Sequence, residues 1–312
     1  MKTVTVNFGL SSPLKLKRQA GVALLQVLLL STTVTVLALG FTKTAREQIR
    51  MAEAIEGRIL AQFEADSVMN EVVFSQLAHQ VYPQAAFGDS DIGPVVERKE
   101  DLNLFNKPVM WTSDAIIRIQ DLNGLLPQAY PQHFAWSKLL FQLGLTEAEI
   151  EAYLGVWGDA QDPDRRSWII GAEEPSALPN GMPYINGTAQ SDQVMRAVFA
   201  DRPDIIEQLL AYSNIYSPYK INLLNTPKPL LITLLGDELG TSVSNMRESG
   251  ANEVTIRSML PSEFRVESVS IYRSTYHRID ISVEFGDFKW NQSRIIRVSP
   301  SSETPFSVLF NS

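Results

Sequence analysis

The sequence reads KLKRQAG over Lys15–Gly21 and continues directly as VALLQVLLLSTTVTVLALGF over Val22–Phe41. In an ordinary secretory signal, small residues after the apolar core mark the cleavage site, and the core is discarded. Here the candidate cleavage site, Gly21, lies before the apolar core. Cleavage there would remove a basic leader, residues 1–21, and would leave the apolar segment as the start of a mature chain at Val22.

The apolar segment Val22–Phe41 is long enough to cross a membrane. Its 20 residues, at about 1.5 Å rise per residue, extend about 30 Å, which matches a bilayer core. The basic residues that precede it place the N-terminus in the cytoplasm by the positive-inside rule: Lys2, Lys15, Lys17 and Arg18. We therefore expect a single-pass membrane protein whose larger part is exported.

Helical periodicity continues beyond the apolar segment, and there is no proline between Pro13 and Pro83. Apolar residues recur at helical spacing: Ile49, Ile55, Ile59, Phe63, Val73 and Leu77. The pattern predicts one helix from about Val22 to about Val81, with a transmembrane or fibre-core part at 22–41 and an amphipathic continuation at 42–81. Two alternatives stay open: a plain signal anchor followed by a soluble domain, and conventional cleavage near residues 38–40.

Composition narrows the classes of partner. The chain has 312 residues and a net charge of −8, and removal of the basic leader would make it more acidic. An acidic exported region does not suggest nucleic acid or anionic lipid as a partner. The absence of cysteine excludes disulfides, thiol catalysis and cysteine-ligated metals.

In the rest of the chain, the spacing of apolar residues changes twice, from a strand pattern to a helix pattern and back. A strand is predicted at 114–120 with a turn at 121–124, short helices follow from Tyr130 to about Leu235, and three strands are predicted at 267–272, 278–285 and 292–298. A helical block between strands of one sheet is best explained as an insertion. The expected fold class is α+β: a long N-terminal helix on a small antiparallel sheet formed by 82–124 and 264–312, with an inserted all-α domain at 125–263.

This order of elements resembles that of the minor pseudopilins of type II secretion, K type (general secretion pathway protein K, GspK). The segments that carry the resemblance run through most of the chain: Arg18–Leu25, Leu37–Gly40, Arg46–Gln48, Asp121–Gly124, Phe141–Leu145, Trp157–Ala160, Gly171–Glu174, Pro183–Tyr184 and Ile221–Pro227. The C-terminal strands resemble the family only weakly. The family fold is pilin-like, in keeping with the α+β expectation.

The resemblance implies a non-enzymatic assembly protein. Prepilin peptidase would cut between Gly21 and Val22, and the mature subunit would lie in lipid, in the bacterial inner membrane, before assembly. Its C-terminal domain would be periplasmic, and its partners would be other minor pseudopilins of the tip complex and the inner-membrane secretion platform. Two alternatives remain: a signal-anchored periplasmic enzyme or sensor, and a minor pilin of a related type IV pilus system.

Gln26 stands at the fifth position after Gly21. Most pilins have glutamate there, and a carboxylate within an apolar segment is offset by pairing with the N-terminal ammonium of the next subunit. Glutamine cannot form that charge pair, and a subunit with no neighbour above it does not need it. The K-type family shares the lack of glutamate, which implies a place at the fibre tip. The alternative is that Gln26 is simply a tolerated polar residue.

The sequence contains few motifs that indicate catalysis or metal binding. The three histidines, His79, His133 and His277, have no metal-ligand spacing, and hydrolase and phosphate-binding motifs are absent from the sequence, so an enzyme is disfavoured. One metal hypothesis rests on an acidic, turn-rich stretch that would offer the oxygen ligands calcium prefers: Asp159, Asp162, Asp164, Glu173 and Glu174.

The K-type family carries calcium in its inserted domain, but Gln161 stands where that family tends to have an acid. The alternative is that the acids are solvated and face Arg165 and Arg166. A set of aromatic residues in the same block is predicted to be core rather than a recognition surface: Trp136, Phe141, Trp157 and Trp168.

Overall fold

The structure is a computed structural model that describes residues 20–81, 102–163, 178–216, 220–251, 253–264, 269, 273–286, 288–299 and 303–311. Two compact units divide the chain, residues 1–59 and residues 60–312, and the boundary falls inside the first helix.

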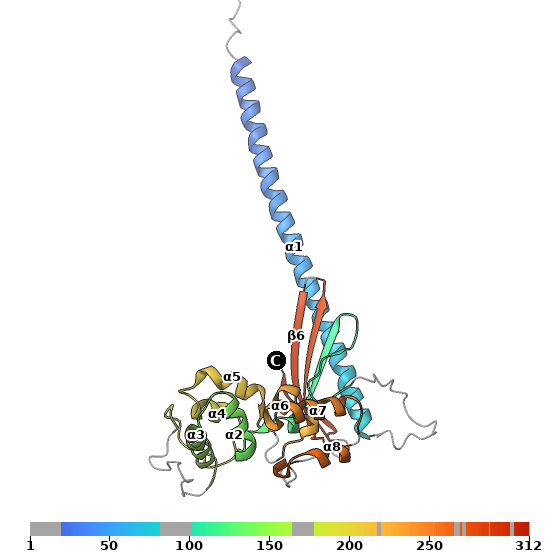
Figure 1. Cartoon of the computed structure of the whole chain (residues 1–312). Coiled ribbons are helices and arrows are strands. Elements are labelled where there is room, and N and C mark those ends of the chain that lie inside the picture. Colours follow the sequence, from blue (N-terminus) through green and yellow to red (C-terminus); the bar gives the residue numbers. More distant parts are fainter. Residues whose placement is uncertain are drawn as a thin grey trace, which may run out of the picture. The chain divides into compact units, whose positions relative to one another are not determined.

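Helix α1 (Ala20–Val81) is a single α-helix of 62 residues (Figure 1). This confirms the prediction of one uninterrupted helix from about Val22 to about Val81. The helix persists because no proline interrupts it, and because Gly40 is its only glycine between Gly21 and Gly57.

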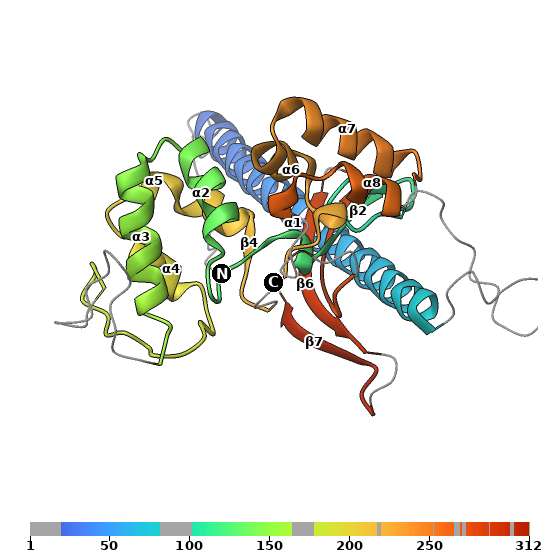
Figure 2. The same cartoon turned by 60° about the horizontal axis from the view of Figure 1, so that its bottom comes forward.

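The last part of α1, from Leu60 onward, buries one face against a sheet. Its buried residues follow the three- and four-residue spacing of a helix stripe: Ala61, Ala65, Val68, Met69, Val72 and Val73. Figure 2 shows this part of α1, in cyan, along the strands of the sheet. Phe63 and Phe74 lie off the stripe and remain exposed.

The sheet has five antiparallel strands in the order β1-β2-β5-β6-β7. Their bounds are β1 (Val109–Met110), β2 (Ala115–Asp121), β5 (Tyr276–Phe285), β6 (Phe288–Val298) and β7 (Phe306–Asn311). Alternate residues of β2 and β5 point into the core with α1, and Ile117 pairs with Ile281 across them. The ion pair of Arg294 with Asp66, 2.7 Å long, also joins β6 to α1.

All the remaining described helices lie in sequence between β2 and β5, which are neighbours in the sheet. They are α2 (His133–Gln142), α3 (Glu147–Asp159), α4 (Gln193–Val198), α5 (Pro203–Ala211), α6 (Lys228–Leu235), α7 (Asp237–Glu248) and α8 (Glu253–Met259). Short 3-10 turns η2 (Leu122–Gly124), η3 (Leu223–Asn225) and η4 (Ser262–Phe264) and a two-stranded parallel pair, β3 (Leu126–Pro127) and β4 (Ser213–Asn214), complete this block.

Local sequence signals explain several helix starts. Thr146 caps α3 with the predicted capping box: the Thr146 backbone N–H donates to the Glu149 carboxylate at 2.8 Å, and the Glu149 N–H donates to the Thr146 hydroxyl at 3.4 Å. Helices α5 and α6 each have proline in their first turn, where the missing N–H costs nothing.

The helical block has its own apolar core. Trp136 and Trp157 are fully buried in an edge-to-face contact with ring centroids 4.6 Å apart, and Phe199 packs on Trp157. The prediction that the aromatic set forms core is therefore correct for the two tryptophans. It is wrong for Phe141, which is 67% exposed near the end of α2, and Trp168 lies outside the described residues.

Other sequence predictions differ in detail from the structure. The strand expected at 267–272 is described only at Val269, which makes an isolated parallel bridge with Ile221. Strand β7 was not predicted, and neither were β1, α7 and α8 as separate elements. The fold class is as expected: a long N-terminal helix packed on an antiparallel sheet with additional helices, an α+β pilin-like arrangement.

Candidate functional site

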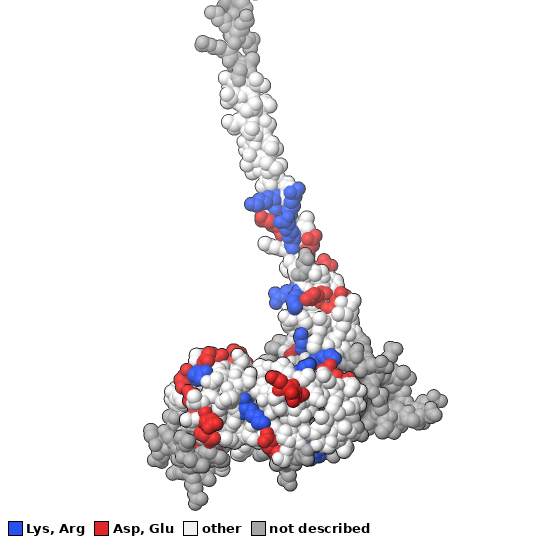
Figure 3. Space-filling model, in the orientation of Figure 1, with Lys and Arg blue, Asp and Glu red and all other residues white. Residues whose placement is uncertain are grey.

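The apolar part of α1 is the first candidate site. Large apolar side chains from Val22 to Phe41 are all more than half exposed, and Phe41 reaches 74%. The face shown in Figure 3 has no charged side chain along this stretch, and charges begin at Lys43. Burying each such side chain is worth about 1.5–3 kcal/mol. The segment therefore needs an apolar environment, and its length and composition suit a single membrane anchor.

The hydroxyl groups within this segment are satisfied by the helix itself. Four hydroxyls in the segment donate to backbone carbonyls three or four residues earlier: Ser31, Thr32, Thr33 and Thr35. Thr42 and Thr44, just beyond it, do the same. In hydrocarbon, polar groups need partners inside the chain. These residues can therefore lie in a bilayer or between packed helices without leaving a hydroxyl donor unpaired.

Gln26 lies exposed in the first turns of the apolar part of α1, flanked by exposed Leu25 and Val27. Its amide is polar but has no charge at any pH. Gln26 thus lies within the exposed apolar segment, whose side chains need an apolar environment outside this chain. Gly21 and Val22, the predicted cleavage position, lie in the first turn of α1.

The acidic stretch at the end of α3 is the second candidate site. Asp159, the last residue of α3, is fully buried, and Asp162 is half-buried in the turn that follows. Asp164, Glu173 and Glu174 lie outside the described residues. Within the described part of the chain, no three His, Asp or Glu side chains gather as a metal site. The five-residue calcium site stays a prediction.

Gln161 has a structural role next to these acids. Its buried amide donates to the Gln128 carbonyl at 2.9 Å and accepts from the Ala189 N–H at 3.0 Å. Both amide atoms thus join three loops, which gives Gln161 a structural role. Asp159 and Asp162 offer the hard oxygen donors that calcium takes, so the chemistry fits at these two positions.

Two of the segments that carry the resemblance, Asp121–Gly124 and Ile221–Pro227, pack against each other. The Asn222 N–H donates to the Asn123 carbonyl at 2.6 Å. A Cβ placed on Gly124 would lie 2.1 Å from the Asn225 carbonyl oxygen, so only glycine fits there. Sequence reasoning singled out both segments but could not show that they touch.

Asp121 holds this junction together. Its buried carboxylate accepts hydrogen bonds from the Asn123 N–H, the Asn225 side-chain amide and both the N–H and hydroxyl of Ser274. Opposite it in the sheet lies His277, which is also fully buried. Burial lowers the pKa of His277 to about 4; the Asp121 charge opposes this shift, and Arg273 adds to it. His277 is therefore neutral at neutral pH.

Of the two histidines whose side chains the structure describes, His133 has the neighbours that most resemble those of a catalytic histidine. Its Nε2 lies 2.5 Å from the Glu151 carboxylate and its Nδ1 3.2 Å from the Ser137 hydroxyl. The Ser137 hydroxyl, however, donates to the His133 backbone carbonyl at 2.6 Å, one turn earlier in α2. Both His133 and Glu151 are about half exposed. This arrangement is a surface contact of α2 with α3 and not an activated nucleophile.

Comparisons with known proteins add one observation. No family model matches the chain, and no curated protein matches it. Among solved structures that resemble it is a chain in the crystal structure of the GspK-GspI-GspJ complex from the enterotoxigenic Escherichia coli type 2 secretion system. That likeness has 12% sequence identity and a TM-score of 0.48, and it covers 80% of this chain and 98% of that chain. At these values it establishes no family.

Proposed function

We propose that this chain is a minor pseudopilin of a type II secretion system, of the K type, which caps or initiates a periplasmic pseudopilus at its tip. The observation that carries the proposal is α1: one uninterrupted helix, apolar and exposed in its first part and packed on an antiparallel sheet in its last. A helix of this kind can anchor one subunit in lipid and later pack against the helices of other subunits.

Maturation fits the order of the N-terminal segments. Prepilin peptidase would remove residues 1–21 and leave Val22 as the first residue, so the apolar part of α1 would remain in the mature subunit. Partners would be other minor pseudopilins of the tip complex and the inner-membrane secretion platform. The body that follows, rich in acidic residues, would lie in the periplasm.

Gln26 supports the tip position. A neutral amide does not need the N-terminal ammonium of a subunit above, whereas a carboxylate in the same apolar segment would. The α2–α8 block would then close the free end of the fibre. A purified complex in which another subunit sits above this one would contradict the tip position and leave the pseudopilin assignment standing.

The proposed processing is tested with Gly21→Ala. We expect the variant to keep its leader and to fail in co-purification with partner pseudopilins and in protein export. Gly9→Ala is the matched control, because it makes the same substitution within the leader but away from the proposed cleavage position. The control should mature and assemble like the natural protein. Normal export by Gly21→Ala would favour the signal-anchored enzyme or sensor instead.

The proposal includes a calcium ion held by Asp159, Asp162, Asp164, Glu173 and Glu174. Calcium would neutralise carboxylates that burial disfavours and would fix the turn after α3. We expect EGTA to lower the unfolding temperature of the full chain, and added calcium to restore it. Equal melting with and without EGTA would remove the ion and would favour acids paired with Arg165 and Arg166.

A further inference from the structure

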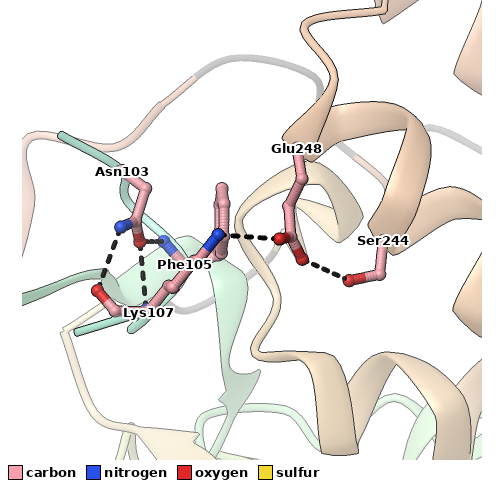
Figure 4. A network of polar contacts seen from close by, with 5 residues as sticks. All are labelled: Asn103, Phe105, Lys107, Ser244 and Glu248. Carbon is pink, nitrogen blue, oxygen red and sulfur yellow. Dashed lines mark hydrogen bonds and ion pairs between the residues drawn. The ribbon is translucent and has the colours of Figure 1, made fainter. Parts of the chain in front are cut away.

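A pocket of about 650 Å³ lies between the segment Leu102–Met110 and the end of α7, and none of its lining residues belongs to the acidic stretch. Leu224 and Asn225 of η3 and Ile256 of α8 complete its lining. The Asn103 side chain fixes the turn on one side, because it accepts from the N–H groups of Phe105 and Lys107 and donates to the Lys107 carbonyl (Figure 4). The wall is therefore preorganised rather than a loose loop.

Arg247 is the unusual group in this pocket. Its guanidinium lies 4.0 Å from the centre of the Phe105 ring, and its Nη1 donates to the carbonyls of Leu224 and Thr226. Its Nε and Nη2 are buried and have no hydrogen-bond partner within the part of the chain that the structure describes. Burial lowers its pKa to about 10, so it still carries its charge at neutral pH.

The neighbouring acid, Glu248, attracts Arg247, but its carboxylate oxygens bond to other groups. Glu248 accepts from the Lys107 ammonium at 2.8 Å and from the Ser244 hydroxyl at 3.2 Å (Figure 4). With Arg247 and Lys107 positive and Glu248 negative, these three lining residues leave one positive charge. A buried cation with unused donors is costly unless an acceptor reaches it.

We propose that this pocket binds a carboxylate, which pairs in a bidentate manner with Nε–H and Nη2–H of Arg247. These two donors lie on one edge of a planar guanidinium and match the two oxygens of a carboxylate. The apolar lining, which includes Leu102, Leu104 and Ile256, would contact the body of the ligand. Carboxylate binding in this pocket does not depend on the proposed role in secretion.

Access requires a small rearrangement. Because Nε and Nη2 are covered, the ligand must displace a lining side chain, and the Lys107–Glu248 pair is the most readily opened contact. That pair is partly exposed, and exposed ion pairs contribute little to stability. A carboxylate that enters could also meet the Lys107 ammonium.

The test uses the full chain in detergent, with arginine labelled by nitrogen-15, and follows the Nε–H resonance of Arg247. The probes are butyrate and the blocked peptides acetyl-Leu-Glu-Leu-amide and acetyl-Leu-Gln-Leu-amide, at constant ionic strength. We expect the glutamate peptide to shift the resonance saturably and at least about tenfold more tightly than the glutamine peptide. Saturable binding of butyrate as well would show that a free carboxylate suffices; binding of the peptide alone would point to an acidic side chain of a protein.

Variants separate the bidentate contact from general attraction of anions. Arg247→Lys keeps the charge but loses the two-donor edge, so the glutamate peptide should bind about tenfold more weakly, as read by its effect on thermal unfolding. Arg257→Lys is the matched control, because Arg257 is exposed on α8 and does not line the pocket. Should Arg247→Lys not fold, Phe105→Leu keeps the donors and removes the stacked ring, and should weaken binding severalfold.

Three results would overturn the proposal. One is the absence of any saturable shift in the natural protein with butyrate or the glutamate peptide. Another is an equal shift with chloride, which would mean nonspecific attraction of anions. The third is unchanged affinity in Arg247→Lys or, where that variant does not fold, in Phe105→Leu.

Discussion

Asp121 and His277 place two fully buried titratable side chains opposite each other on neighbouring strands. The Asp121 carboxylate accepts hydrogen bonds from three residues, Asn123, Asn225 and Ser274. His277 faces the same core on the next strand and is held neutral by burial. The strand end at which the chain enters the helical block is therefore polar inside: the Asp121 carboxylate has several hydrogen-bond donors, whereas neither ring nitrogen of His277 has a partner in the part of the chain that the structure describes.

At the residue scale we predict a pH dependence that belongs to His277. Its pKa is about 6.5 when unfolded and about 4 when folded, so between these values only the unfolded chain takes up the proton. Stability conferred by neutral His277 is complete above pH 6.5 and is lost as pH falls from 6.5 towards 4, by up to about 3 kcal/mol. His277→Leu should remove this part of the slope.

Urea unfolding of the full chain at pH 7, 6, 5 and 4 measures the slope. A shallower loss of stability in His277→Leu than in the natural protein is expected, whatever the offset at pH 7. Parallel curves for the two proteins would mean that His277 titrates alike in both states.

At the scale of elements, the close approach of η2 to η3 joins the start of the helical block to its later part. We predict that Gly124→Ala destabilises the chain by about 2–4 kcal/mol, because the new Cβ would overlap the Asn225 carbonyl and separate the segments. Gly158→Ala is the control, since it lies in α3 with nothing within 4 Å of a Cβ. Thermal unfolding of both variants measures the difference; equal melting temperatures would contradict the packing described here.

Elements with strong local signals were predictable. Helix α1 follows from a long apolar run and a lack of proline, and the start of α3 follows from Thr146 and Glu149. Strand β7 was missed because its sequence, FSVLFN, has no alternation, and indeed both of its faces are at least partly exposed. Helix α7 was missed because it has few apolar residues and follows α6 after the single residue Gly236.

Contacts between residues far apart in the chain could not be predicted from the sequence. The candidate cleavage position, Gln26 and the acidic stretch could each be named, because each is a local pattern. The bonds from Asp121 to Ser274 and the stacking of Arg247 on Phe105 join residues more than 100 positions apart. Only tertiary structure brings such residues together, and nothing in their local sequence signals it.

At the scale of the whole molecule, two apolar cores lie within residues 60–312, one between α1 and the sheet and one inside the helical block. The apolar part of α1, in residues 22–41, shares in neither core. Its large leucines and valines are each more than half exposed, so the chain itself leaves this apolar surface uncovered. The proposed function assigns that surface first to lipid and then to neighbouring subunits.

The most direct test is the intact mass and N-terminal sequence of the protein extracted from membranes of its own host. The account predicts a mature chain that begins at Val22 and retains the whole apolar segment. A first residue downstream of position 40 would mean that the segment is discarded as an ordinary signal. An intact Met1 would mean that it is an unprocessed anchor, and either result would contradict the pseudopilin account.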